Sequence, residues 1–255
     1  MKYPNPKFSD MSIVTGKAIK DSISDYYPNT KQTGGAQRLA LLKKATNLDE
    51  LIDFCIDGYR AWGDAVLMGA GAYLKIGDFP AEIAKAKEYV KKEIHAYLTG
   101  TPFPAESIYD KWHKDICVNL ADGTQHFEQY SKHRKASTDN FKNKSGFTIG
   151  NAQKFLNMLM KDLYACLSID PTFLPLYEDY FKFCHMPLDS YILRFVDDIR
   201  HREMIKKPAR SYTWGNMNSY DSYMEEQADI REYVKKYNHS VTVLQTEFVI
   251  WPLYK

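Results

Sequence analysis

The sequence predicts an all-α protein, with many helices folded into one globular unit. Two observations support this fold class. Apolar residues recur at helical spacing from about Gln37 to Tyr237, and neither an alternating strand–helix rhythm nor an internal repeat interrupts them. The chain has 255 residues, of which 44% are hydrophobic and 26% charged. That length and composition are sufficient to bury a core without disulfide or metal crosslinks.

The chain divides by composition into an arm and a helical domain. Residues 1–35 are rich in proline and glycine and predict an irregular N-terminal arm with one short helix near 16–25. Residues 36–255 predict a single helical domain, with two possible lobes at 36–120 and 147–255. Residues 121–146 are polar and basic, and we expect them to form a mobile loop between the lobes.

Helices are expected along both halves of the helical domain. In the first half they cover 36–46, 48–59, 81–98 and 107–120, while the small residues of 63–77 indicate close helix packing. Asn47 is the expected N-cap of the second helix, and Glu50 completes a capping-box pattern. In the second half we expect helices at 151–167, 172–183, 190–205 and 220–237, with a turn around Trp214. The tail after residue 240 mixes strand and helix signals, and we expect a helix there.

Composition excludes several classes of protein and site. The net charge is only +2, so binding of nucleic acid would require a local basic cluster. The four cysteines lack metal-ligand spacing and are expected to be buried thiols, so we expect neither a metal nor a cofactor. The sequence contains neither a membrane-spanning apolar stretch nor a hydrophobic secretory leader. We therefore expect a cytoplasmic protein, and the composition does not define its oligomeric state.

One stretch, residues 147–195, carries a pattern associated with chemistry. Gly150 precedes a helix with a wide apolar face, and its other side carries Lys154, Asn157 and Lys161 on one stripe. Further along, Pro187 favours extended backbone before it, and Asp189 stands where an N-cap belongs, immediately before an apolar helical run. Individually, a capping aspartate and a helical lysine are ordinary structural features. It is their order along the chain that is informative.

This order resembles the helix-hairpin-helix/GPD superfamily of DNA glycosylases, and most of all its archaeal 8-oxoguanine glycosylase branch. Ala152-Gln153-Lys154 stands where the superfamily has Gly-x-Lys, and Pro187-Leu188-Asp189 stands where it has Pro-Val-Asp. The similarity covers about 50 of the 255 residues. Two departures are visible: Ala152 replaces the second glycine of the hairpin, and 35 residues separate Lys154 from Asp189, more than in most members.

The resemblance implies a helix-hairpin-helix element and a base-excision reaction on double-stranded DNA. Lys154 would attack the sugar C1′ of a damaged nucleoside, and Lys161 would supply a cation that lowers the pKa of Lys154. Asp189 would stabilise the cationic sugar and move protons. Residues expected around the displaced base or the lysine are Asn157, Lys161, His185 and Trp214. Those expected against the DNA backbone are Gly150, through its N–H, and the basic side chains Lys132, Arg134, Lys135, Lys142 and Lys144.

Two other functions explain parts of the same pattern. A non-catalytic helical binding protein, of the kind that sequesters a nucleotide or a partner protein in host defence or in phages, explains the modest charge and the 19 tyrosines. It predicts a closed pocket away from Lys154 and Asp189. A helical enzyme acting on a phosphorylated small molecule could use Lys154, Lys161 and His185, and predicts arginine or histidine around one anion site. A purely structural role for His185 is to hydrogen-bond its own turn.

Overall fold

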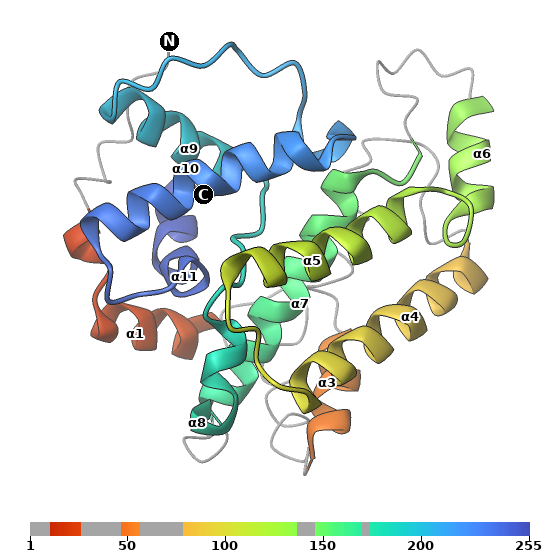
Figure 1. The fold of residues 1–255 in the computed structure, drawn as a ribbon, viewed down its shortest axis with the longest axis horizontal. Coiled ribbons are helices and arrows are strands. Elements are labelled where there is room, and N and C mark those ends of the chain that lie inside the picture. Colours follow the sequence, from red (N-terminus) through yellow and green to blue (C-terminus); the bar gives the residue numbers. More distant parts are fainter. Residues whose placement is uncertain (1–10, 27–46, 57–78, 137–145, 170–173) are drawn as a thin grey trace.

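The structure, a computed structural model, describes residues 11–26, 47–56, 79–136, 146–169 and 174–255 (Figure 1). These residues contain α-helices and short 3-10 helices and no strand, which confirms the all-α class. The α-helices are α1 (Gly16–Tyr26), α3 (Leu48–Ile56), α4 (Pro80–Thr99), α5 (Glu106–Ala121), α6 (Glu128–Ala136), α7 (Ile149–Ile169), α8 (Leu174–Tyr177), α9 (Ser190–Arg202), α10 (Tyr220–Tyr237) and α11 (Val243–Tyr254). The 3-10 helices are η1 (Met11–Ile13), η5 (Glu178–Phe181) and η6 (Trp214–Asn216).

Helix α7 lies at the centre of the molecule. It packs most extensively against α5, and also against α3, α1, α8, α10 and η6. In Figure 1, α3 and α4 lie on one side of α7, and α1, α9, α10 and α11 lie on the other. Its central position buries polar as well as apolar faces, so that Gln153, Lys154, Asn157, Lys161 and Asp162 are all buried. A helix surrounded in this way must satisfy its polar groups within the protein.

The N-terminal elements join the same core. Met11, Val14, Ile19 and Ile23 are buried in one cluster with side chains of the later helices. Helix α1 packs against α11, which brings described residues near the start of the chain against its last helix. The side-chain amide of Asn238 donates hydrogen bonds to backbone carbonyls of Met11 and Val14 at 3.4 and 2.7 Å.

Most expected helices that fall within the described residues are present. The expectation for 220–237 matches α10 in both bounds, and the 16–25, 81–98, 107–120 and 151–167 helices match within two residues at each end. Asn47 caps α3 by accepting from the N–H of Glu50 at 3.0 Å. The tail is helical, as expected, because Thr242 and Gln245 form a reciprocal capping box at the start of α11. The helix expected at 36–46 and the small-residue segment 63–77 lie outside the described residues.

The expectation of a loop over 121–146 is wrong for residues 128–136, which form α6. A distant side chain supplies the start signal: the carboxylate of Glu82, on α4, accepts from the backbone N–H groups of Gln129 and Tyr130 at 2.7 and 3.1 Å. Phe127 packs its ring on Phe147, with centroids 4.0 Å apart. Neither contact is local in sequence. Residues 137–145 lie outside the described part.

Two other expected helices are shorter than the sequence pattern indicates. Within 174–183, the described part of the expected 172–183 helix, α8 and η5 form, each of four residues. The helix expected at 190–205 ends at Arg202, and Met204 then adopts a positive φ of 53°. None of the helices in the described residues is both long and apolar enough to span a membrane.

Candidate functional site

The two residues singled out by the sequence pattern contact each other. The Nζ of Lys154, on α7, lies 3.2 Å from Oδ2 of Asp189, at the start of α9. Their side chains are only 9% and 10% exposed. The predicted approach of the two side chains is therefore confirmed, although they form a covered ion pair and do not face each other across an open cleft.

The carboxylate of Asp189 accepts four hydrogen bonds. Its Oδ1 caps α9 by accepting from the backbone N–H groups of Tyr191 and Ile192 at 2.8 and 2.9 Å, as predicted for an N-cap. Its Oδ2 accepts from Lys154 and from Nε1–H of Trp251, on α11, at 3.0 Å. Burial alone would raise the pKa of Asp189, but the charge of Lys154 and these hydrogen bonds hold it below its ordinary value. Asp189 is therefore ionised at neutral pH.

The turn that contains η6 covers Lys154. The Trp214 ring lies over the Lys154 ammonium, with Nζ 4.7 Å from the ring centroid. The turn is attached to the start of α7, because Gly150 N–H donates to Met217 O at 2.9 Å and Thr148 Oγ1 donates to Gly215 O at 3.2 Å. A Cβ added to Gly150 would lie 1.6 Å from Trp214 O, so this close approach requires glycine.

The predicted phosphate contact through Gly150 therefore needs correction. Its N–H is already donated to the carbonyl of Met217, and the Trp214 turn occupies the space in front of the helix. A phosphate could reach this N–H only if the turn moved away.

Lys161 has its own carboxylate partner, which the sequence did not indicate. Its Nζ forms an ion pair with Glu247, on α11, and both side chains are at most 5% exposed. Burial raises the pKa of Glu247 above its ordinary value, while the charge of Lys161 opposes this rise. The Lys161 Nζ also lies 5.7 Å from the Trp251 ring centroid. Trp251 thus lies between two buried ion pairs. Lys161 faces Glu247 and not Lys154, to which we expected it to supply a neighbouring cation.

Asn157 and His185, expected to contact substrate, lie in a second buried network. Both are fully buried, and each hydrogen-bonds the hydroxyl of Tyr223, on α10, at 2.9 and 2.6 Å. His185 Nε2 also lies 2.8 Å from Oδ1 of Asp110, on α5. Burial lowers the pKa of His185 to about 4, with the hydrogen bond to Asp110 opposing the shift. His185 does not hydrogen-bond its own turn, because its partners lie on α5 and α10. The same contacts occupy the ring nitrogens that the base-pocket role requires.

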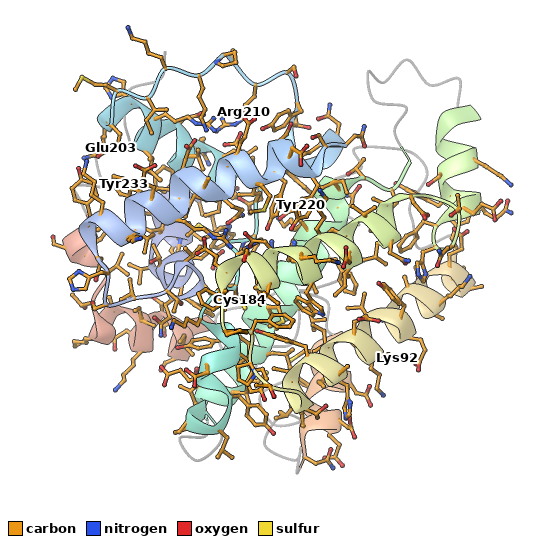
Figure 2. All side chains as sticks on the ribbon, viewed as in Figure 1. Lys92, Cys184, Glu203, Arg210, Tyr220 and Tyr233 are labelled. Carbon is orange, nitrogen blue, oxygen red and sulfur yellow. The ribbon has the colours of Figure 1, made fainter. Side chains whose placement is uncertain are left out.

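The same network continues to His113, on α5. Its Nε2 lies 2.9 Å from Asn157 Oδ1, and its Nδ1 lies 2.8 Å from the hydroxyl of Tyr220. Figure 2 shows Tyr220 at the start of α10, above α5. Burial lowers the pKa of His113 well below its ordinary value, and neighbouring His185 adds to this effect. Two histidines held neutral thus link α5, α7 and α10.

Of the basic residues expected to contact DNA between positions 132 and 144, the structure describes the side chain of Lys132. Lys132 lies on α6, is exposed, and pairs with Glu128 at 2.5 Å. Arg134 and Lys135 belong to the same helix, but their side chains lie outside the described part, as do Lys142 and Lys144 entirely. No group of three or more His, Cys, Asp or Glu residues within the described ranges is placed to hold a metal ion. All four cysteines are buried, as expected.

The arginines near the helical core pair with carboxylates of the chain itself. Arg200 and Arg210 both pair with the buried carboxylate of Glu226, at 2.9 and 2.8 Å. Figure 2 shows Arg210 on the segment between α9 and α10. Arg231 pairs with Asp110 at 2.6 Å. These carboxylates neutralise the positive charge of the arginines, which is therefore not available to a phosphate. The geometry gives no support to an enzyme acting on a phosphorylated small molecule.

Comparison of the chain with models of known protein families, with curated proteins and with solved structures finds no match.

Proposed function

We propose that this chain is a base-excision DNA glycosylase with lyase activity, in which Lys154 is the nucleophile and Asp189 the stabilising carboxylate. One observation carries the proposal: the two residues paired by the sequence resemblance lie 3.2 Å apart, 35 positions apart in the chain. Asp189 also caps α9, the place that the resemblance gives to the catalytic aspartate. Ordinary packing does not require a lysine and a capping aspartate to meet in the interior.

The reaction follows from the chemistry of the pair. Asp189 accepts a proton from the Lys154 ammonium, and the neutral amine attacks the sugar C1′. The bond from Nζ to C1′ forms as the glycosidic bond to the damaged base breaks, and the base leaves with its electron pair and takes up a proton. Ring opening of the sugar then gives a Schiff base, from which the 3′ phosphate leaves by β-elimination. The proton that the base takes up comes from Asp189, so the carboxylate is ionised again as the base departs and stabilises the positive charge on the sugar.

The proposal requires the turn containing Trp214 to move. Lys154 is covered by the Trp214 ring, and a displaced nucleotide cannot reach its Nζ in this arrangement. Movement of residues 213–217 away from α7 would expose Nζ, free the N–H of Gly150, and leave an aromatic ring beside the entering base. Double-stranded DNA would then bind over the N-terminal end of α7, and the basic side chains of residues 132–144 would contact phosphates without reading sequence.

Borohydride trapping on damaged duplexes tests the proposal. The wild-type chain should form a covalent adduct with at least one duplex of a panel that contains oxidised, deaminated, alkylated and abasic sites. Lys154→Gln should abolish the adduct. The matched control is Lys111→Gln, which removes an exposed lysine paired with Asp115 and should leave the adduct unchanged. If the wild type formed no adduct with any duplex, or if Lys154→Gln still formed one, the proposed chemistry would be wrong.

A non-catalytic binding protein is the second candidate, because a pocket lies away from Lys154 and Asp189, although it is not the closed pocket that this candidate predicts. A half-open pocket of about 240 Å³ lies at the C-terminal ends of α9 and α10, at the far end of α9 from Asp189. Glu203 and Tyr233, labelled in Figure 2, line it together with Lys236. A thermal-shift screen of nucleotides tests this candidate: a rise in Tm that Lys236→Ala removes would support it, whereas the glycosylase predicts no such rise.

A further inference from the structure

We propose that Gln153 is the positioning residue that places Asp189 against Lys154, through paired hydrogen bonds to the backbone of Leu188. The catalytic meaning of this role rests on the proposed function, but the positioning itself is a property of the fold and can be tested without activity. Gln153 immediately precedes Lys154, and Leu188 immediately precedes Asp189. The two hydrogen bonds between Gln153 and Leu188 therefore join the residue before Lys154 to the residue before Asp189.

Two glutamine side chains hold the segment that leads to Asp189. Gln153 accepts from Leu188 N–H at 3.1 Å and donates to Leu188 O at 3.0 Å. Gln227, on α10, makes the same two contacts with Met186, at 3.2 and 2.7 Å. Between them, Pro187 has no N–H to satisfy. The two amides therefore occupy the positions that a neighbouring strand would take beside an extended segment.

The orientation of the Gln153 amide follows from its other neighbours. Its Nε2 donates to Gly150 O at 2.9 Å as well as to Leu188 O, so two carbonyls face the nitrogen. Its Oε1 accepts from Asn157 Nδ2 at 3.1 Å as well as from Leu188 N–H. All four contacts agree with one orientation, and Gln153 is completely buried.

Asn157 connects Gln153 to the buried network of histidines and tyrosines. Asn157 donates one amide hydrogen to Gln153 and the other to the hydroxyl of Tyr223, while its Oδ1 accepts from His113. The hydroxyl of Tyr223 lies 2.6 Å from His185 Nδ1, and His185 Nε2 lies 2.8 Å from Asp110 Oδ1 and 2.6 Å from Nη2 of Arg231. These contacts run without a gap from Asp110 to Leu188. This gives Asn157 a specific role, which is to hold the amide that positions Asp189.

Gln153→Glu tests the role with little change in size. It places a carboxylate oxygen opposite the carbonyls of Gly150 and Leu188, where Nε2–H now donates, and so removes the attraction that holds Leu188. Gln227→Glu is the matched control. It makes the same chemical change in the amide that holds Met186, which lies three residues before Asp189. The amide of Gln153 holds Leu188, which immediately precedes Asp189.

The indole N–H of Trp251 reports the position of Asp189 independently of activity, because it donates to Asp189 Oδ2. In proton–nitrogen NMR spectra of the full chain, Asp189→Asn serves as the reference for a disturbed contact. We expect Gln153→Glu to move the Trp251 indole resonance most of the way to its position in Asp189→Asn, and Gln227→Glu to move it much less. An unmoved resonance in Gln153→Glu, or an equal movement in Gln227→Glu, would overturn the proposal.

A measurement on the wild type covers the case in which the variants do not fold. The Leu188 N–H, donated to a buried amide, should belong to the slowest-exchanging amides of the chain in hydrogen exchange. Exchange as fast as that of exposed loop amides would overturn the proposal. Borohydride trapping separates the two claims. Absence of adduct in the wild type would refute the glycosylase alone, while an adduct formed by Gln153→Glu at the wild-type rate would refute the positioning role alone.

Discussion

The indole of Trp251 donates a hydrogen bond to Asp189 Oδ2 across 62 residues of sequence, with a separation of 3.0 Å between the two heavy atoms. This contact fixes the last helix to the start of α9 and gives the Asp189 carboxylate a donor besides Lys154. The ion pair is therefore not an isolated pair of charges, since its anion is satisfied by the backbone, an indole and an ammonium together.

The two members of the ion pair should differ in how much stability their loss costs. Asp189→Asn leaves a buried ammonium without its counterion, and we expect it to lower the free energy of unfolding by about 3 to 5 kcal/mol. Lys154→Met should cost less, because the carboxylate keeps three donors. The double variant should cost less than the sum of the two. Urea denaturation at pH 7 measures all three, and additive losses would show that the side chains do not interact.

Gly150→Ala should displace the turn that covers Lys154, since the new Cβ would lie 1.6 Å from Trp214 O. We expect faster reductive methylation of Lys154 and a more solvent-exposed Trp214 emission. Gly16→Ala is the control, because a Cβ at Gly16, in the first turn of α1, meets nothing within 4 Å. Equal methylation rates of Lys154 in both variants would show that the turn does not restrict access.

Stability should fall on mild acidification because of His185. Its pKa is lowered by burial to about 4 in the folded state, from an unfolded value of 6.5. The unfolded chain therefore binds the proton first. The contribution is complete above about pH 6.5 and is lost as the pH falls towards 4, by about 3 kcal/mol in total. Urea denaturation between pH 7 and 4.5 should show this loss, and His185→Gln should reduce the slope. An unchanged slope in that variant would exclude His185 as its cause.

The proposed function predicts that DNA binding depends steeply on salt. About four phosphate contacts from the basic side chains of 132–144 give a slope of log affinity against log salt of about −3 to −4. Replacing Lys132, Arg134 and Lys135 by alanine should reduce this slope by about two to three units and weaken binding to all sequences equally. Filter binding at several salt concentrations measures it. A wild-type chain that does not bind duplex DNA at low salt would remove DNA as a partner.

The sequence anticipated those parts of the fold and site that depend on local pattern. The N-cap at Asp189 and the bounds of α10 follow from residues within a few positions of each other. The start of α6 could not be anticipated, because Glu82 supplies its cap from another helix. Glu247 and Trp251 were missed for the same reason: the sequence showed an apolar tail, and only the packing of α11 brings the two side chains to α7 and α9.

The burial of the polar residues on α7 could not be predicted, because the period of a helix does not say which face meets solvent. Lys154, Asn157 and Lys161 form one stripe, which suggested a surface open to a ligand. The helix is instead enclosed, and each of these side chains has a partner from another part of the chain. Gln153 carried no signal of its own, since its importance lies in the backbone of Leu188, 35 residues away.

Peptide mapping of a borohydride-trapped adduct tests the central claim most directly. The wild-type chain is trapped with the reactive duplex, the DNA is digested, and the protein is cleaved and analysed by mass spectrometry. We predict a sugar remnant on one peptide, the one that contains Lys154, with the modification on Nζ of that residue. A remnant on Lys132 or on the N-terminal amine, or no remnant with any damaged duplex, would contradict the assignment of Lys154 as the nucleophile.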